Sequence, residues 1–390
     1  MDVHSRDVPP EGFALMDEFH IQDARIMKYL GWQEWTAASY TPPATAFNYG
    51  YDFEKASGTR YFVIGDEDYL YANPHTGTFT NLNPAAPFNG AATDRWQGVE
   101  FNDKLYLSNR VDGLQVFNGT TLATLASTAD GGQPTSAWTM ENVLSHIVLG
   151  NTVEGGTRFR QRVRWCKIDN PDIWIPSATQ ADSLTANNEA GYYDFPQDLG
   201  EILVIKNLGP NAALIYGTRG IFRMSYIGLP LVWSFERVVD GEGIFAPYSM
   251  AVANDVHFFL GNRDFYMFSG SGELRGIGAD RVISSFLGRY DKTERENIYS
   301  FVHHHFTEIW WVYVNKLRNL STFNSALCYN WHTDTWSTRG ETTPFNFSFL
   351  ASYLTAEQKT IEDATNAIRD AVGTWRDKQS KGSWVIIGGN

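Results

Sequence analysis

Three consecutive histidines are the residues whose chemistry stands out first in this sequence, because neutral imidazole is a common metal ligand. They are His303, His304 and His305. Successive side chains of an extended strand point to opposite faces, so at most His303 and His305 can lie on the same side. No HExxH pattern accompanies them, and aromatic residues surround them. The pattern therefore favours histidines packed on a strand over a metal site.

Two other segments resemble ligand-binding loops only in part. Asp66, Glu67 and Asp68 offer carboxylates, but they lack the spaced oxygen ligands of a calcium-binding loop. The glycine-rich segment 270–276 has one residue too many for a dinucleotide-binding loop, and no helical pattern follows it. We therefore assign no catalytic, cofactor-binding or metal-ligating residue. We expect a protein that is not an enzyme and uses no cofactor.

Cysteine content, charge and aromatic content narrow the class of protein. Cys166 and Cys328 lie far apart in apolar-rich runs, which allows one disulfide but favours two buried thiols. The 390 residues carry a formal net charge of −13, so the chain is a poor candidate for gripping phosphate backbones. Aromatic residues make up 15% of the chain, which excludes disordered and linker-like classes. The first residues lack the apolar core of a signal peptide, so we expect synthesis in the cytoplasm.

A recurring hairpin is the main structural signal. It consists of a short apolar run, a glycine-containing turn and an apolar return strand that begins four residues after the glycine. The three strongest copies are residues 61–71, 213–223 and 257–268, with glycines at Gly65, Gly217 and Gly261. Glycine adopts a left-handed backbone without steric cost, which explains why it recurs at such turns.

Weaker copies of the hairpin place further turns near residues 102, 150 and 307. Four of the five intervals between successive turns approach the ~40–50 residues of a four-stranded propeller blade. The one long interval leaves room for an inserted loop between Asn170 and Gly200. We therefore predict an all-β fold, a β-propeller of about six blades, with a pair of β-sandwiches as the alternative.

The predicted propeller spans residues 41–355, with an extension at each end. Residues 1–40 form an N-terminal extension, in which alternation near residue 22 favours a hairpin over a short helix. Residues 356–390 contain a motif repeated every seven residues, which fits a helix and an extended strap equally well. The last residues, from Trp384, resemble the first half of a hairpin. This segment either closes the ring by pairing with an early strand or lacks its return strand.

The predicted insertion combines acidic and aromatic side chains in a long aperiodic segment, and loops of this length usually contact partners or carry function. Its acidic residues are Asp182, Glu189, Asp194 and Asp198, and its aromatic residues are Trp174, Tyr192, Tyr193 and Phe195. A contact arm to a neighbouring subunit and a loop folded over its own blade fit this composition equally well.

Several segments of the chain resemble structural proteins of tailed bacteriophages. They are the runs 213–222, 233–235, 243–249 and 259–268, together with 169–174, Gly31-Trp32 and the repeated motif of the C-terminal region. Within that group the pattern resembles the tail nozzle, or packaged-DNA-stabilisation, proteins of short-tailed (podovirus-like) phages. The resemblance covers most of residues 19–390.

The resemblance implies a structural virion protein of the tail, without enzymatic activity, that is assembled in the host cytoplasm. It implies a homo-oligomer, a hexameric ring below the head-to-tail adaptor protein, with tail fibres or tailspikes around it and the host surface at its distal end. Such a nozzle retains packaged duplex DNA and conducts it, without sequence-specific binding, during genome ejection. The net negative charge agrees with a conduit that must not bind DNA.

Two other functions are alternatives to the nozzle. A propeller can carry an enzyme site or a glycan-binding site in its central funnel, and the 13 tryptophans would suit a glycan. A receptor-binding adhesin of the same particle is the other alternative. The enzyme or glycan-binding protein would be a monomer, whereas the adhesin would adsorb to host cells.

Overall fold

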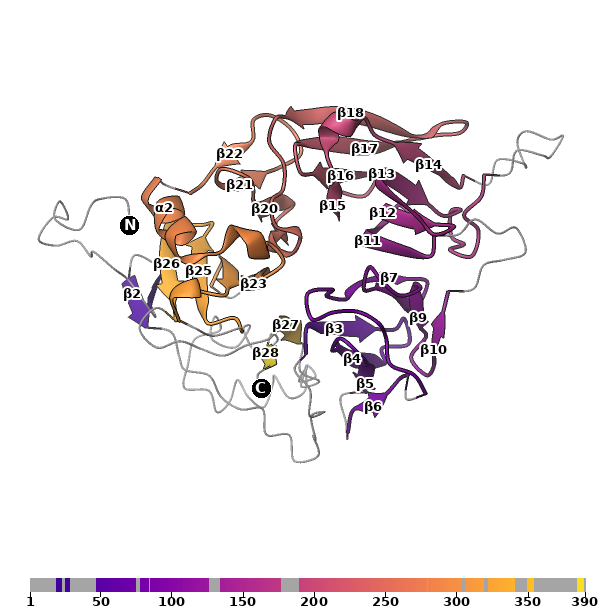
Figure 1. The fold of residues 1–390 in the computed structure, drawn as a ribbon, viewed down its shortest axis with the longest axis horizontal. Coiled ribbons are helices and arrows are strands. Elements are labelled where there is room, and N and C mark those ends of the chain that lie inside the picture. Colours follow the sequence, from indigo (N-terminus) through magenta and orange to yellow (C-terminus); the bar gives the residue numbers. More distant parts are fainter. Residues whose placement is uncertain are drawn as a thin grey trace, which may run out of the picture.

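Six four-stranded antiparallel sheets surround a common centre in the computed structural model of the chain (Figure 1). Each sheet is made of four consecutive strands, of which the first lies nearest the centre and the last at the rim. The chain is therefore a six-bladed β-propeller, which confirms the predicted fold class. The structure describes residues 19–22, 25–28, 47–74, 78–83, 85–125, 134–176, 189–278, 280–303, 306–318, 322–340, 349–353 and 384–388.

The strands follow one another in the order of the blades. Blades 1 to 3 comprise β3 (Tyr49–Glu54), β4 (Arg60–Gly65), β5 (Leu70–Asn73) and β6 (Thr80–Asn81); β7 (Gln97–Phe101), β8 (Lys104–Ser108), β9 (Gln115–Phe117) and β10 (Leu122–Thr124); and β11 (Ser136–Val143), β12 (His146–Glu154), β13 (Thr157–Trp165) and β14 (Gly191–Asp194). Blades 4 to 6 comprise β15 (Ile202–Asn207), β16 (Ala212–Gly217), β17 (Gly220–Gly228) and β18 (Val232–Asp240); β19 (Ala251–Ala253), β20 (Val256–Leu260), β21 (Phe265–Phe268) and β22 (Arg275–Gly276); and β23 (Ile298–His303), β24 (Glu308–Tyr313), β25 (Ser325–Asn330) and β26 (Thr335–Arg339).

The predicted hairpin turns fall at two different positions in the blades. Gly65, Gly217 and Gly261 lie at the turn between the second and third strands of blades 1, 4 and 5. The left-handed backbone expected there is wrong, because none of the three has a positive φ. Glycine is required instead by close packing, since a Cβ atom at each would come within 3.0 Å of another residue. Residues 102 and 307 lie instead between the first and second strands of blades 2 and 6. The three strong copies are therefore equivalent, whereas these two weaker copies are a different hairpin of the blade.

The turn predicted near residue 150 is wrong, because Gly150 lies inside strand β12. The pairing of β12 with β13 shifts register between Gly150 and Thr152, which is typical of a β-bulge. A Cβ atom at Gly150 would approach Ile205 Cδ1 to 2.9 Å and Ile202 Cγ2 to 3.0 Å, both in the next blade. This glycine therefore allows close packing between blades rather than a turn.

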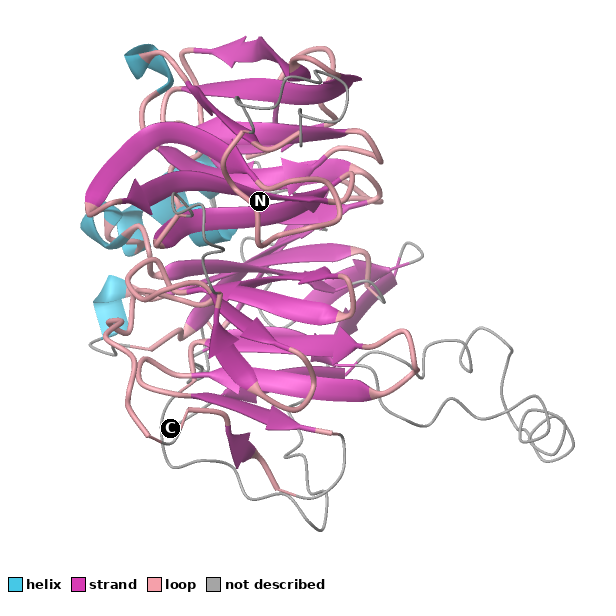
Figure 2. Cartoon of the chain, turned by 90° about the vertical axis from the view of Figure 1, so that its right-hand side faces the viewer, coloured by secondary structure: helices cyan, strands magenta, loops and turns pink. Residues whose placement is uncertain are grey.

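The propeller has two distinct faces. We call the first the connection face; it is formed by the links between blades and by the turns between second and third strands. The opposite hairpin face is formed by the turns between first and second strands and between third and fourth strands. Helical turns gather on one side of the ring in Figure 2, in connections and turns of the connection face. They are η2 (Gln197–Leu199), η3 (Pro247–Ser249), α2 (Asp280–Arg289), η4 (Lys292–Glu294) and η5 (Lys316–Arg318).

Helix α2 is an element that the hairpin pattern does not predict. Its buried residues Val282 and Phe286 lie four positions apart on one helical face, and the Phe286 ring stacks 5.1 Å from Tyr290. All three residues pack into the hydrophobic core shared by blades 5 and 6. A helix of ten residues offers too few turns for its period to be distinguished from short strands. No helix in the described part of the chain is long and apolar enough to cross a membrane.

Aromatic side chains fill the core between blades 5 and 6. The ring centroid of Phe265 lies 4.6 Å from that of Trp311 and 5.4 Å from that of Trp336. The indole nitrogen of Trp311 donates a hydrogen bond of 2.8 Å to the carbonyl oxygen of Ser249, so its polar atom is satisfied in the core. The high aromatic content of the chain is therefore used, at least here, to join neighbouring blades.

A buried histidine links blades 4 and 5. His257 is fully buried, and its Nε2–H donates a hydrogen bond of 2.8 Å to the carbonyl oxygen of Asn207, which can only accept one. Its Nδ1 lies 2.8 Å from the hydroxyl of Tyr216, which therefore donates to it. Burial lowers the pKa of His257 to about 4, so the ring is neutral at pH 7.

We expect His257 to make the stability of the propeller fall below pH 6.5. Its folded pKa is depressed, so its contribution is present above the unfolded pKa and is lost as pH falls from ~6.5 toward ~4. The free energy of unfolding should decrease by about 2 kcal/mol between pH 7.5 and pH 5 from this group. Urea unfolding at each pH, compared with His257→Gln, isolates the effect. An unchanged pH profile in the variant would contradict the assignment.

Two short hairpins flank the six blades. The N-terminal hairpin of β1 (Phe19–Gln22) and β2 (Arg25–Lys28) confirms the predicted hairpin, and β1 lies beside the rim strand β26 (Figure 1). Strand β28 (Trp384–Gly388) pairs with β27 (Phe349–Tyr353) rather than with an early strand. Strand β27 in turn lies against the inner strands β3 and β23, between the first and last blades. The repeated motif near residues 361–377 lies outside the described residues.

Both cysteines are buried and neither forms a disulfide, which confirms the predicted thiols. The backbone N–H of Ile147 donates a hydrogen bond of 3.1 Å to Cys166 Sγ. Burial raises the pKa of Cys166 to about 12, so this thiol stays protonated and unreactive at neutral pH.

Candidate functional site

Arginine and aromatic side chains from blades 2 and 3 and from the connection between blades 4 and 5 meet on the connection face. Arg95 precedes β7, Arg110 follows β8, Trp138 lies in β11, Arg158 in β13 and Tyr248 in η3. We call these five residues the arginine–aromatic cluster. They are brought together by the links between blades and the turns after second strands, which converge on this face.

Cation–π contacts connect the members of the cluster. The guanidinium carbon of Arg110 lies 4.6 Å from the ring centroid of Tyr248 and 5.9 Å from that of Trp138. The guanidinium carbon of Arg158 lies 3.4 Å from the Trp138 ring, and that of Arg95 lies 5.8 Å from Tyr248. Such contacts attract a cation to the negative face of the ring without neutralising its charge.

The carboxylate of Glu201 pairs with two arginines at the edge of the cluster. Glu201 forms an ion pair with Arg158, and its other oxygen lies 3.6 Å from Arg295 Nη2. Burial raises the pKa of Glu201, but the hydrogen bond from Asn151 and the charges of Arg158 and Arg295 outweigh it, and the pKa is lowered. Glu201 is therefore ionised at neutral pH and pairs with both arginines, and Arg295 also pairs with Glu296 at 3.1 Å.

Burial also changes the arginines themselves. Loss of solvent lowers the pKa of Arg95 and of Arg158, and in both residues the charge of Arg110 lowers it further. Arg95 Nη1 donates a hydrogen bond of 3.1 Å to the carbonyl oxygen of Asn48. Arg110 is therefore close enough to repel the guanidinium groups of both Arg95 and Arg158.

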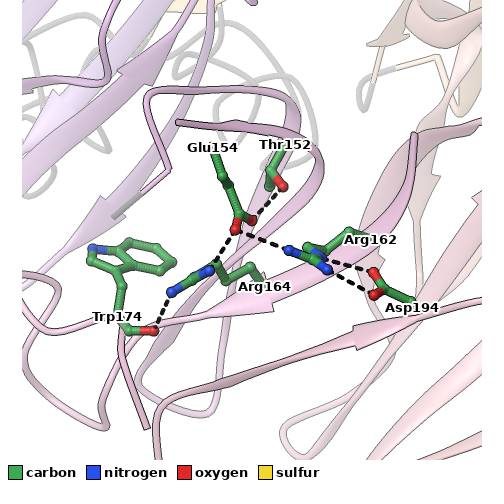
Figure 3. Close-up of polar contacts among 6 residues, drawn as sticks. All are labelled: Thr152, Glu154, Arg162, Arg164, Trp174 and Asp194. Carbon is green, nitrogen blue, oxygen red and sulfur yellow. Dashed lines mark hydrogen bonds and ion pairs between the residues drawn. The ribbon is translucent and has the colours of Figure 1, made fainter. Parts of the chain in front are cut away.

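A second arginine network holds the outer strands of blade 3 together (Figure 3). Glu154, at the end of β12, accepts hydrogen bonds from Thr152 Oγ1 at 2.7 Å, Arg162 Nη1 at 3.1 Å and Arg164 Nη1 at 2.6 Å. Arg162 also donates two hydrogen bonds of 2.7 Å to Asp194 in β14, a bidentate pair. This network fixes the fourth strand to the blade.

The described ends of the predicted insertion pack on the propeller itself. Arg164 Nη2 donates a hydrogen bond of 2.9 Å to the carbonyl oxygen of Trp174, whose side chain is buried (Figure 3). Tyr193 stacks on Phe235 of blade 4 with 4.3 Å between ring centroids, and Phe195 lies 4.8 Å from Phe222. These residues favour a loop folded over its own and the next blade.

Other residues of the predicted insertion have separate positions. Residues 191–194 are not loop but strand β14 of blade 3, because they pair with β13. Asp198 forms an ion pair of 2.6 Å with Arg237, and the Tyr192 side chain is exposed beside Arg162. Residues 177–188, including Asp182, lie outside the described residues.

Glu189 belongs to a polar cluster between blades 3 and 4 on the hairpin face. Tyr226 Oη donates to its carboxylate at 3.3 Å, and His146 Nε2 lies 3.6 Å from Glu189 Oε2. His146 Nδ1 lies 2.9 Å from the carbonyl oxygen of Leu144, and the ring packs 5.4 Å from Trp233. Burial lowers the pKa of His146, so this ring is neutral at pH 7.

The hairpin face also carries an acidic hollow at the first turns of blades 1 to 3. Its volume is about 230 Å³, and its lining includes Glu54, Glu100, Asp103 and Asn142. Glu100 accepts a hydrogen bond of 3.4 Å from the backbone N–H of Glu54, and burial raises the pKa of Glu100. This hollow is acidic, whereas arginines dominate the arginine–aromatic cluster on the connection face.

Exposed apolar side chains gather at the tip of the β17–β18 hairpin. Ile227 is 52% exposed, Leu229 42% and Leu231 69%, and all three lie at or next to the turn. Figure 1 places β17 and β18 at the outer rim of blade 4. Leu317 in η5 is equally exposed at 69%, but it stands on the connection face.

The motifs that suggested chemistry in the sequence have structural positions. His303, the last residue of β23, stacks on Phe306 with 4.4 Å between ring centroids, and His304 and His305 lie outside the described residues. Asp66 is buried, and its Oδ1 accepts the backbone N–H groups of Asp68 and Tyr69 in a turn. Within the described residues, no three His, Cys, Asp or Glu side chains form a group able to hold a metal ion. Residues 270–274 form the predicted turn between β21 and β22, and Arg275 and Gly276 are strand β22 itself.

Comparisons with known proteins give similarities of fold only. No protein-family model and no curated protein matches the chain. A streptogramin B lyase structure has a TM-score of 0.45 at 10% identity, covering 76% of this chain and 84% of that chain. A virginiamycin B lyase from Staphylococcus aureus has a TM-score of 0.45 at 9% identity, covering 75% and 84%. The computationally designed Ika8 protein has a TM-score of 0.41 at 11% identity, covering 76% and 74%. Scores and identities this low carry no argument on function, and the propeller assignment follows from the strand order itself.

Proposed function

We propose that the chain is a non-enzymatic structural protein of a phage tail, one subunit of a ring-shaped nozzle that retains packaged DNA and conducts it during genome ejection. The resemblance of its sequence to tail nozzle proteins of short-tailed phages motivates the proposal. In this role its partners are further copies of itself in a hexameric ring, the head-to-tail adaptor, and tail fibres or tailspikes.

The apolar tip of the β17–β18 hairpin is the observation that supports a role in assembly. Ile227, Leu229 and Leu231 are exposed together at one turn, whereas exposed apolar residues on a monomer are usually scattered. A neighbouring subunit that covers them would remove their apolar surface from water. The net charge of −13 suits a ring through which DNA must pass without binding.

We expect Leu231→Asp to weaken self-association of the purified chain at least about tenfold, because a charge in an apolar contact costs more than 1.4 kcal/mol. Leu317→Asp is the matched control, since the two leucines are equally exposed at 69% on opposite faces. Sedimentation velocity over a range of concentrations measures the effect. Equal loss of self-association in both variants would contradict a specific contact at the hairpin tip.

Electron microscopy of the chain, alone and mixed with the tail components of its particle, tests the function itself. A six-fold ring with a hole wide enough for duplex DNA is the expected result. A ring that forms only in the mixture would mean that the nozzle is built on a platform. A monomer under both conditions would overturn the proposal in favour of a glycan-binding propeller, an enzyme or an adhesin, as would absence of the chain from purified particles.

A further inference from the structure

We propose that the arginine–aromatic cluster binds a small phosphate-bearing solute, with Arg110 as its central ligand. The site lies on the connection face and is independent of the ring assembly proposed above. Three features support this site: the charge of Arg110, which no described carboxylate balances, the arginines beside it, and nearby acids that bind other groups.

Arg110 is a buried cation that stacks on aromatic rings but pairs with no carboxylate among the described residues. Arg110 is only 5% exposed, and its Nε and Nη2 atoms are buried without a hydrogen-bond acceptor. No carboxylate in the described part of the chain forms an ion pair with it. A buried guanidinium group is unfavourable unless an anion or other acceptors bind it, so Arg110 is suited to bind an anion.

The acidic residues next to Arg110 are engaged elsewhere. Asp112 accepts hydrogen bonds from the side chains of Asn89 and Asn109, and Asp94 accepts the backbone N–H of Ala91 at 3.0 Å. Glu201 is shared by Arg158 and Arg295. Among the described residues, the acids near the cluster therefore bind other groups, and none of them pairs with Arg110.

The charge balance favours phosphate over a carboxylate. Glu201 and Glu296 together balance Arg158 and Arg295, whereas Arg110 brings a further positive charge that repels Arg95. A phosphate group carries about −1.5 to −2 at pH 7 and can offset the charge of Arg110 together with its repulsion of Arg95, whereas a carboxylate carries only −1. The forked guanidinium also matches two phosphate oxygens at once.

The backbone conformation of Arg110 is energetically unfavourable as well. Its φ of 74° lies in the left-handed region, which is uncommon for residues other than glycine. The backbone N–H of Arg110 donates a hydrogen bond of 3.3 Å to Ser108 Oγ, which helps to hold this conformation. Such outliers persist where the surrounding structure imposes them, and they concentrate at ligand sites.

The test compares the melting temperature of the full chain in inorganic phosphate and in chloride at equal ionic strength. For the wild type, each tenfold increase in phosphate above its dissociation constant is expected to raise Tm by about 2 °C. Arg110→Met should abolish this rise, and its Tm in chloride should equal or exceed that of the wild type, because an unpaired buried charge is removed. Arg110→Lys keeps the charge but not the fork, and should weaken binding about tenfold.

Arg263→Met is the matched control, because Arg263 is an exposed arginine in a turn of the same face, and it should keep the full phosphate response. No phosphate response of the wild type, or an equal response of Arg110→Met, would overturn the site. A lower Tm of Arg110→Met in chloride would assign Arg110 a purely structural role. A duplex oligonucleotide distinguishes the source of the phosphate: duplex binding by the wild type that Arg110→Met loses would overturn the assignment to a small solute.

Discussion

Replacing Gly243 with alanine is expected to destabilise the propeller by about 4 kcal/mol or more, or to prevent soluble expression. Gly243 lies in the connection between β18 and β19, where the chain passes directly over the β16–β17 turn of the preceding blade. A Cβ atom there would overlap the carbonyl oxygen of Gly217 and come within 2.7 Å of the carbonyl carbon of Thr218. These are backbone atoms, so no side-chain rotation can relieve the overlap.

The adjacent hydrogen bond makes the overlap difficult to avoid. The backbone N–H of Ile244 donates to the same Gly217 oxygen at 3.0 Å, and Phe245 continues with a bond of 2.9 Å to Leu260. Moving the connection away would break these links between blades 4 and 5. The free energy of unfolding from urea titration is the measurement, supported by the yield of soluble protein.

Gly288→Ala is the matched control for that prediction. Gly288 lies in helix α2, and no atom would come within 4 Å of the added Cβ. Alanine favours a helix over glycine by up to about 1 kcal/mol, so this variant should be as stable as the wild type or more stable. Similar destabilisation in both variants would show that any added methyl group is harmful, and that the contact at Gly243 is not special.

The regular part of the fold could be predicted from the sequence because it depends on local signals. Gly65, Gly217 and Gly261 mark equivalent turns, and each is followed by an apolar strand four residues later. Their spacing indicates four-stranded units, and the observed sheets agree with it. Gly150 gives the same signal from inside a strand and is misread as a turn, because its contact with the next blade leaves no trace in neighbouring residues.

The candidate site could not be predicted, for the same physical reason. Arg95 and Arg110 each stand alone in the sequence, and their approach to Tyr248 depends on connections from blades that are far apart along the chain. Arginines alternate along β13 in the sequence, but this period of two does not indicate which of them pairs with an acidic side chain. Only the folded ring shows that Arg158 finds Glu201 and Arg110 finds no carboxylate among the described residues.

Replacing Glu201 with glutamine is expected to cost about 3 kcal/mol of stability, because it leaves a partly buried arginine cluster without its shared anion. The glutamine keeps the size of the side chain and the hydrogen bond from Asn151, so the decrease in unfolding free energy reports mainly the loss of the negative charge. Glu236→Gln is the matched control: Glu236 pairs with Arg223 at 2.5 Å at the exposed rim, where loss of an ion pair should cost less than about 1 kcal/mol. Equal losses in the two variants would contradict a special role of Glu201.

The pH dependence of the same variant has a definite sign. The folded pKa of Glu201 is lowered, so its contribution is present above the unfolded pKa near ~4.5 and is lost as pH falls below it. The difference in unfolding free energy between wild type and Glu201→Gln should therefore be constant from pH 6 to pH 8, and should shrink in acid. A difference that grows in acid would exclude the ion pairs as its source.

A double-mutant cycle with Arg110 then connects the stability of the cluster to its charge. Because Arg110 repels Arg158 within the cluster, Arg110→Met should recover part of the stability that Glu201→Gln loses. Salt screens repulsion between exposed charges, so the recovery should be larger at low salt. The recovery that persists at high salt comes from the buried part of the interaction. Strictly additive effects would mean that Arg110 and Glu201 do not share one electrostatic site, since removing either charge would then leave the other unaffected.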